Sequence, residues 1–245
     1  MDAAEWDEHY ASTELVWGAP PNATVVEQVF GLERRAPVGG IDEPRPELPR
    51  VLDLGCGEGR NALWLATHGW RVDAVDFSQT GIDKGRTVAS RLSRSVRGRI
   101  HWIHANVMQL DAAGITGPYE LILVAFLHLP AADRRALLLH ATEMLSPEGT
   151  LLVIGNDTLN LAEGYGGEQD PARTFTPADI LADLSPAEPD IRIRIADRVH
   201  RPTEDRDAID ALVVATRLAP ELRDEPLALE APQPPALDSS DGTPR

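Results

Sequence analysis

The chain has 245 residues, 42% of them hydrophobic, which suits one α/β domain with its own core, or such a domain with a tail. Its formal net charge of −16 disfavours nucleic acid, whose phosphates would be repelled, as a partner. A single cysteine excludes an intrachain disulfide, and the absence of both a signal-peptide pattern and a membrane-spanning apolar run predicts a cytoplasmic protein with no membrane partner.

The first 35 residues are expected to form an N-terminal helical segment. Asn22 can cap a helix over residues 23–32, and the preceding residues 6–22 combine aromatic and polar side chains. We expect residues 6–22 to close over a site as a lid, with Tyr10 and Trp17 facing it. A helix packed permanently on the domain edge is the alternative.

From residue 50 onward, apolar runs alternate with helical patterns. Strands are expected at residues 50–54, 70–77, 99–103, 119–126 and within 146–156, and helices at 59–69, 78–96 and 130–145. Such alternation predicts a parallel sheet covered on both faces. No long insertion stands out after residue 50, so the N-terminal segment is the expected cover of the carboxyl ends of the strands.

The pattern changes after residue 175. A short helix is expected at residues 176–184, and two strands at 190–200 and 207–217 are joined by a short link, which predicts an antiparallel pair. The fold class is therefore α/β, a Rossmann-like, doubly wound, mostly parallel seven-stranded sheet with an antiparallel last strand. The domain is expected over residues 50–218, and residues 219–245 are expected to be a disordered, acidic, proline-rich tail.

A glycine loop follows the first strand of this sheet. Gly55, Gly57 and Gly59 give the pattern G-x-G-x-G, and Arg60 occupies the slot of the third glycine in a dinucleotide-binding loop, so NAD fits poorly. Asp76 ends the next strand, and its carboxylate can accept hydrogen bonds from both hydroxyls of a ribose.

The segment "VLDLGCGEGRNALWLA" resembles the first motif of class I S-adenosylmethionine-dependent methyltransferases. "VDAVDFS", "HANVMQL", "YELILVAFLHLP" and "LSPEGTLLVI" resemble the later motifs, so the resemblance runs from about residue 50 to 156. It implies S-adenosylmethionine as the cofactor. The cofactor-binding residues that it implies are Asp53, Gly55, Cys56, Gly57, Arg60, Asp76, Phe77, Ser78, Asn106, Val107, Ala125 and Phe126, with Tyr10 and Trp17 from the leading segment.

Both ends of the chain are similar to a narrower subgroup, the tellurite-resistance and small-molecule thiol-type methyltransferases. "WDEHY" and "WGAPPN" resemble a leading segment that folds over the cofactor, and the resemblance places Arg60 near the methionine carboxylate. "VHRPTEDRDAIDALVVATR" resembles the end of the tellurite enzymes, which implies a substrate-side role for His200 and Arg201.

The sulfonium methyl group is already activated, so the reaction is an in-line displacement, and a general base is optional. His200 or His128 can serve as that base for a hydroxyl or amine acceptor, whereas a soft acceptor needs none. Cys56 is expected to serve packing, and no Cys/His cluster has metal-ligand spacing.

Three functional hypotheses stay open. The chain is a methyltransferase of a small molecule with a thiol, metalloid or similar soft nucleophile, a methyltransferase of a larger acceptor, or a non-catalytic regulator that binds S-adenosylmethionine. We expect the first, acting on a small-molecule substrate as a monomer or homodimer.

Overall fold

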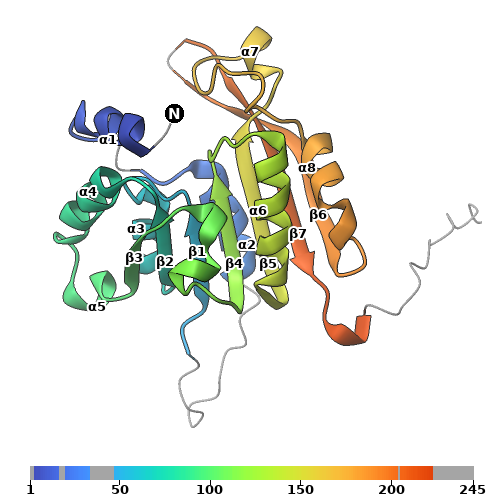
Figure 1. Ribbon diagram of the computed structural model, residues 1–245, viewed down its shortest axis with the longest axis horizontal. Coiled ribbons are helices and arrows are strands. Elements are labelled where there is room, and N and C mark those ends of the chain that lie inside the picture. Colours follow the sequence, from blue (N-terminus) through green and yellow to red (C-terminus); the bar gives the residue numbers. More distant parts are fainter. Residues whose placement is uncertain (1–2, 17–19, 34–46, 204, 223–245) are drawn as a thin grey trace, which may run out of the picture.

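The structure, a computed structural model, describes residues 3–16, 20–33, 47–203 and 205–222. Its centre is a seven-stranded sheet in the order β3-β2-β1-β4-β5-β7-β6 (Figure 1). The strands are β1 (Arg50–Leu54), β2 (Arg71–Asp76), β3 (Ile100–His104), β4 (Tyr119–Ala125), β5 (Leu145–Asn156), β6 (Ile191–Arg201) and β7 (Ala208–Arg217). The first five run parallel, and β7 is antiparallel to both β5 and β6, which confirms the predicted fold class.

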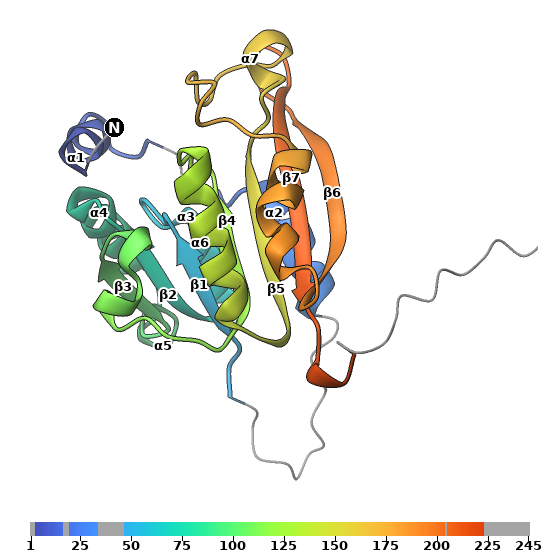
Figure 2. The ribbon, with the colours of Figure 1, turned by 45° about the vertical axis from the view of Figure 1, so that its right-hand side comes forward.

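Helices cover both faces of the sheet (Figure 2). The longer ones are α1 (Ala3–Ala11), α2 (Ala23–Glu33), α3 (Arg60–Thr67), α4 (Gln79–Ala89), α6 (Ala131–Glu143) and α8 (Pro177–Leu184). The short ones are α5 (Arg94–Arg97), α7 (Asn160–Glu163), η1 (Val107–Gln109), η2 (Asp111–Ala113), η3 (Ser185–Ala187) and η4 (Pro220–Leu222). Helices α2 and α3 pack in one apolar core and α6 and α8 in the other, so the sheet separates two cores.

The middle of β4 shows how the sequence builds both cores. Leu121 and Leu123 belong to the core under α2 and α3, whereas Ile122 and Val124 belong to the core under α6 and α8. A strand that is buried on both faces needs apolar residues at every position, not at alternate ones. This explains the unbroken apolar run in the sequence.

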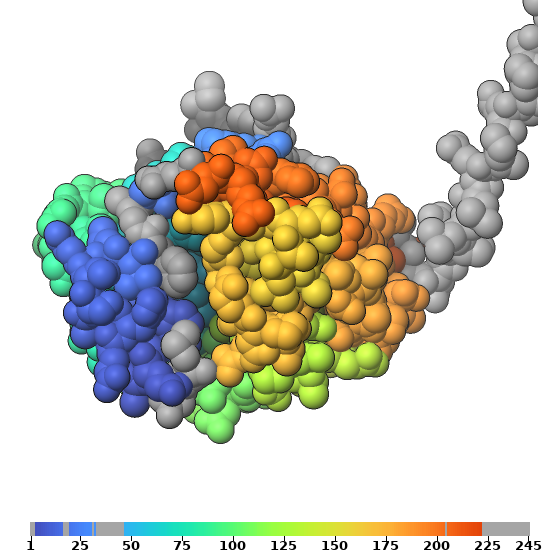
Figure 3. Space-filling model, turned by 90° about the horizontal axis from the view of Figure 1, so that it is seen from above, coloured from blue at the N-terminus to red at the C-terminus, as the bar shows by residue number. Residues whose placement is uncertain are grey.

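The strand order reverses between β1 and β4, because the chain passes from β1 to β2 and β3 on one side and to β4 and β5 on the other. Ligands of doubly wound sheets bind beyond the carboxyl ends of the strands at such a point. Two segments flank this end: α1 and the residues between β5 and α8, which include α7 (Figure 1). From above, a hollow lies between these two segments (Figure 3).

The segment after β5 corrects one expectation. Residues 157–176 separate β5 from α8 and rise over the carboxyl end of the sheet, so the N-terminal segment is not the only cover of the site. The helix predicted over residues 78–96 also differs, because α4 ends at Ala89 and α5 begins at Arg94. The Ser93 hydroxyl accepts the backbone N–H of Val96 and starts the second helix, as serine commonly does.

Several predictions fall outside the described residues. These include the position of Trp17 and nearly all of the predicted tail, of which only residues 219–222 are described. Within the described ranges, no helix has the length and apolar character to cross a bilayer. In the same ranges, no three His, Cys, Asp or Glu side chains gather as metal ligands would.

Candidate functional site

The loop between β1 and α3 is built on three glycines with left-handed backbone. Their φ angles are 72° at Gly55, 54° at Gly57 and 76° at Gly59, a conformation that other residues rarely adopt. The backbone N–H groups of Gly55 and Cys56 both donate to the carbonyl of Val75, so the loop is tied to β2. A Cβ at Gly57 would lie 2.5 Å from the hydroxyl oxygen of Tyr10, so only glycine fits this close approach.

Asp76 stands beside this loop at the end of β2 and is 5% exposed. Its Oδ2 accepts the N–H of Gly57 at 2.7 Å, and its Oδ1 accepts the N–H of Ser78 at 2.8 Å. Burial raises the pKa of Asp76, and these backbone N–H groups oppose the rise. The hydroxyl of Ser78, which accepts the N–H of Gly81, caps α4. Each oxygen of Asp76 keeps a lone pair for a ribose hydroxyl.

Asp53, on β1 just before the loop, carries an unused acceptor. Its Oδ2 is buried and finds no hydrogen-bond partner in the described parts of the chain. Burial, followed by repulsion from Asp76, raises the pKa of Asp53 to about 7, and Arg60 opposes the rise. A buried oxygen of this kind is costly unless a donor or a cation meets it. Oδ2 of Asp53 can therefore accept a hydrogen bond from a ligand, in particular from a positively charged group.

Arg60, at the first position of α3, supplies the opposite charge. Within the described ranges no hydrogen bond engages its guanidinium, whose central carbon lies 5.9 Å from the centre of the Phe126 ring. Burial, and then repulsion from Arg201, lowers the pKa of Arg60. Phe126 follows β4 with a φ of 58°, which is unusual for a residue other than glycine. Its backbone nevertheless stays fixed, because its N–H donates to the carbonyl of Ile154 at 2.7 Å.

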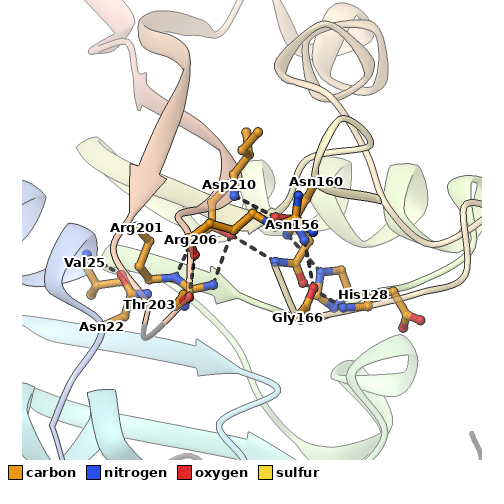
Figure 4. A network of polar contacts seen from close by, with 12 residues as sticks. Asn22, Val25, His128, Asn156, Asn160, Gly166, Arg201, Thr203, Arg206 and Asp210 are labelled. Atoms are coloured by element: carbon orange, nitrogen blue, oxygen red, sulfur yellow. Dashed lines mark hydrogen bonds and ion pairs between the residues drawn. The ribbon is translucent and has the colours of Figure 1, made fainter. Parts of the chain in front are cut away.

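Arg201, at the end of β6, lies across the same aromatic ring, with 5.3 Å between its guanidinium carbon and the centre of Phe126. Its Nε donates to Asp210 Oδ2 at 2.8 Å, and its Nη2 donates to Asp210 Oδ1 at 3.4 Å (Figure 4). Phe126 thus lies near two guanidinium groups, one from α3 and one from β6. The two guanidinium groups gather on one side of the site, where Asp210 balances the charge of Arg201.

Asn156 connects Arg201 to the loops above the sheet (Figure 4). Its Nδ2 donates to Asp210 Oδ1 at 3.0 Å, and its Oδ1 accepts the N–H of Glu168 in the segment after β5. Its backbone N–H donates to Nε2 of His128 at 3.1 Å. Burial lowers the pKa of His128 to about 4, so this side chain is a neutral hydrogen-bond acceptor near pH 7.

His200 and Arg201 are neighbours on β6, so their side chains leave opposite faces of the strand. The side chain of His200 is 62% exposed, with Nδ1 4.0 Å from a carboxylate oxygen of Asp207. The structure therefore brings Arg201, but not His200, to Phe126. The catalytic roles assigned to His200 and His128 remain predictions.

The N-terminal segment is docked on α4 and the glycine loop. Asp7 accepts the Ser78 hydroxyl and the N–H of Thr80, and these contacts lower the pKa of Asp7. Lys84 donates to the carbonyls of Tyr10 and Thr13.

Glu58 in the glycine loop completes this docking. It accepts the N–H of Val16 at 3.1 Å and lies 3.3 Å from Lys84. Tyr10, predicted to face the site, is buried against Gly57.

The remaining predicted residues lie around the same end of the sheet. Burial raises the pKa of the Cys56 thiol, which disfavours the thiolate. Asn106 caps η1 by accepting the N–H of Met108, and Val107 is buried. Ala125 ends β4, and the carbonyl of Phe77 interacts with Nε2 of His104 at 2.9 Å.

Sheet order, glycine loop and the acid at the end of β2 are the features by which class I S-adenosylmethionine-dependent methyltransferases are known. Residues 51–149 match the family model described as a methyltransferase domain. These residues therefore form a methyltransferase domain, and S-adenosylmethionine is its cofactor.

Individual relatives agree with this assignment. The chain is 32% identical over 111 residues to the tRNA 5-carboxymethoxyuridine methyltransferase of Escherichia coli K12, a match that covers 45% of this chain and 41% of that protein. The first curated relatives are matched over only 33% to 41% of their own length.

Solved structures share the fold at low identity. The magnesium protoporphyrin IX methyltransferase of Synechocystis, with bound S-adenosylhomocysteine, superposes with a TM-score of 0.59 at 20% identity, over 79% of this chain and 82% of that one. TehB from Haemophilus influenzae gives a TM-score of 0.56 at 18% identity, over 79% of this chain and 62% of that one.

The residues present fit the cofactor. The unused oxygen of Asp53 suits an ammonium group, and the guanidinium of Arg60 suits a carboxylate, so the two can hold the amino-acid end of S-adenosylmethionine. Asp76 suits its ribose.

The sequence did not predict the two polar residues that hold Arg201 in place, Asp210 and Asn156. Asp210 and Asn156 lie 54 positions apart and meet because β5 and β7 pair antiparallel in that register. A signal existed, since an Asp at 210 and an Asn at 156 interrupt or end otherwise apolar strands.

Proposed function

We propose that this protein transfers the methyl group of S-adenosylmethionine to a small-molecule acceptor with a soft nucleophile, such as a thiol or a metalloid compound. The cofactor supplies a methyl group that its sulfonium already activates. The chain must hold the cofactor, align the acceptor with the S–CH₃ bond and exclude water. In this proposal Asp53 and Arg60 bind the amino-acid end, and Asp76 binds the ribose.

The observation that carries the choice of a soft acceptor is the placement of the two candidate bases. Nε2 of His128 already accepts the N–H of Asn156, and burial lowers its pKa to about 4. His200 is exposed on the face of β6 opposite to Arg201. This arrangement favours an acceptor that needs no general base, because a thiolate or a similar anion attacks without losing a proton in the transition state.

The cover of the site supports a small acceptor. The docked N-terminal segment lies on one side of the hollow and the segment after β5 on the other (Figure 3). We infer that the N-terminal segment acts as a lid over cofactor and acceptor. The resemblance of both chain ends to the tellurite-resistance and thiol-type subgroup supports the same choice.

A larger acceptor is the second candidate, and the tRNA methyltransferase relative favours it. The net charge of −16 weighs against it, because phosphates bind to basic surfaces. A regulator that binds the cofactor without turnover is the third candidate.

One assay separates the three. The full chain is incubated with S-adenosylmethionine and, in separate reactions, with small thiols, tellurite, selenite or tRNA that carries 5-carboxymethoxyuridine, and S-adenosylhomocysteine is quantified. The proposal expects product with thiols or metalloid anions. Product with tRNA alone would favour the larger acceptor. Cofactor binding with no turnover in any reaction would favour the regulator.

A further inference from the structure

We infer that the methyl acceptor carries a negative charge that Arg201 receives, and that Asp210 is the positioning residue that aims Arg201. This inference rests on the proposed function, because it names the class of acceptor for the same site. It adds two statements, the charge of the acceptor and the role of a buried residue that contacts neither reactant.

Asp210 binds one edge of the Arg201 guanidinium, and the other edge is free within the described residues. Asp210 engages its Nε and Nη2, and no hydrogen bond to its Nη1 occurs within the described residues. The side chain as a whole is 33% exposed, so it reaches the surface of the site. A guanidinium presents its donors in a fixed planar fork, so the bond to Asp210 also fixes the direction of the remaining N–H groups.

Asp210 is fully buried and is itself held in place. Asn156 donates to its Oδ1, and the amide oxygen of Asn156 binds the N–H of Glu168, which leaves the Asp210 carboxylate little freedom to turn (Figure 4). Burial raises the pKa of Asp210, whereas the bond to Arg201 and the donor from Asn156 lower it. The ionised state therefore depends on Arg201, and the two residues act as a unit.

The charges nearby indicate the sign of the acceptor. Arg60 and Arg201 both lie over Phe126, and Arg201 lowers the pKa of Arg60 by repulsion. The carboxylate of the cofactor accounts for Arg60, which leaves the free edge of Arg201 for another anion. Asp210 balances the charge of Arg201, so an anion would be received by the remaining N–H donors of this guanidinium, as a charge-assisted hydrogen bond.

A matched pair of probes tests the charge. Mercaptoacetate and 2-mercaptoethanol are small thiols of similar size. Mercaptoacetate carries a carboxylate where 2-mercaptoethanol carries an uncharged hydroxymethyl group. Each is titrated into ¹⁵N-labelled full-length protein saturated with S-adenosylhomocysteine, and the shifts of backbone and arginine Nε–H signals give the affinity. We expect mercaptoacetate to bind at least tenfold more tightly and to shift the Nε–H signal of Arg201. Equal affinities, or shifts confined to other regions, would overturn the inference.

Variants test the role of Asp210, with a control on the same strand. Arg198 binds Asp157 with the same 2.8 Å contact between Nε and a fully buried carboxylate, but it leaves the other face of β6. We expect Arg201→Gln and Asp210→Asn to remove the preference for mercaptoacetate, with unchanged affinity for S-adenosylhomocysteine. Arg198→Gln and Asp157→Asn should keep the preference even where they lower the melting temperature.

The double variant Asp210→Asn with Arg201→Gln removes both charges. It replaces Asp210→Asn in the binding test if that single variant does not fold. It should resemble Arg201→Gln alone in mercaptoacetate affinity, because Asp210 acts through Arg201. A further loss of tenfold or more in the double variant would contradict the positioning role.

Turnover of the same two thiols separates this inference from the proposed function. Binding of mercaptoacetate at Arg201 without methylation would retain the anion site and refute the soft-thiol acceptor. Methylation of both thiols with equal KM, unaffected by Arg201→Gln, would retain the function and refute the anion site.

Discussion

Ionisation of Asp53 should make cofactor binding depend on pH. The pKa of Asp53 in the folded protein is about 7, compared with an ordinary value of 3.8, because the carboxyl group is buried next to Asp76. Because the carboxyl pKa is higher in the folded protein than in the unfolded chain, protonated Asp53 stabilises the fold. This stabilisation is complete below pH 4 and is lost as the pH rises through 7. A pKa difference of about three units corresponds to a change of roughly 4 kcal/mol in the free energy of unfolding, which is an upper bound for the protein without cofactor.

The cofactor reverses this effect, because its ammonium group pairs with ionised Asp53. At pH 5 only about 1% of a group with a pKa near 7 is ionised, so S-adenosylhomocysteine should bind about 100-fold more weakly at pH 5 than at pH 8. Binding near pH 6 should release about one proton, which calorimetry detects as a dependence of the heat on the buffer. The variant Asp53→Asn should bind weakly at every pH and should be more stable than the parent protein at pH 8 without cofactor.

The assay is a set of calorimetric titrations from pH 5 to pH 8 in pairs of buffers with different ionisation enthalpies, with melting curves of both proteins. His140 lies in the last turn of α6 beside Asp111 and offers a control, since His140→Gln should leave the pH profile unchanged. Equal affinity at both ends of the range, or an unaltered profile in Asp53→Asn, would refute the role assigned to the unused oxygen.

Three further predictions address the cofactor site and its cover. Asp76→Asn should weaken S-adenosylhomocysteine binding by at least tenfold. It should also lower the melting temperature, because Asp76 accepts the N–H groups of Gly57 and Ser78. A variant with a lower melting temperature but normal binding would show that Asp76 has a purely structural role. Hydrogen exchange of residues 3–16 should slow when S-adenosylhomocysteine binds, and identical protection in both states would refute the lid. Deleting residues 223–245 should leave turnover and melting temperature nearly unchanged, since this segment is rich in proline and acid, and a large fall in either would show that it contributes to the fold or the site.

The sheet, the glycine loop and the place of Asp76 beside it could be predicted from sequence because local patterns encode them. Strands buried on both faces are apolar throughout, as in β4, and the loop glycines are required by left-handed backbone. Asp76 follows from its place at the end of β2. Each of these features depends on residues close together in the chain.

The acceptor side could not be predicted in the same way, because its contacts join distant segments. The unit of Arg201, Asp210 and Asn156 depends on the register of three neighbouring strands, and the sequence fixes that register only through the packing of their faces. The segment after β5 holds only the four-residue helix α7, so its place above the sheet emerges only in three dimensions. His128 and His200 illustrate the same limit, because a histidine in the sequence does not reveal whether its ring nitrogen is already occupied.

The most direct test of the account is calorimetric titration of the full chain with S-adenosylhomocysteine and with NAD⁺, repeated with Arg60→Gln. We predict one site for S-adenosylhomocysteine in the micromolar range, at least tenfold weaker binding by Arg60→Gln, and no heat with NAD⁺, since Arg60 stands where a dinucleotide-binding loop has its third glycine. Tight binding of NAD⁺ without a response to S-adenosylhomocysteine would contradict the account.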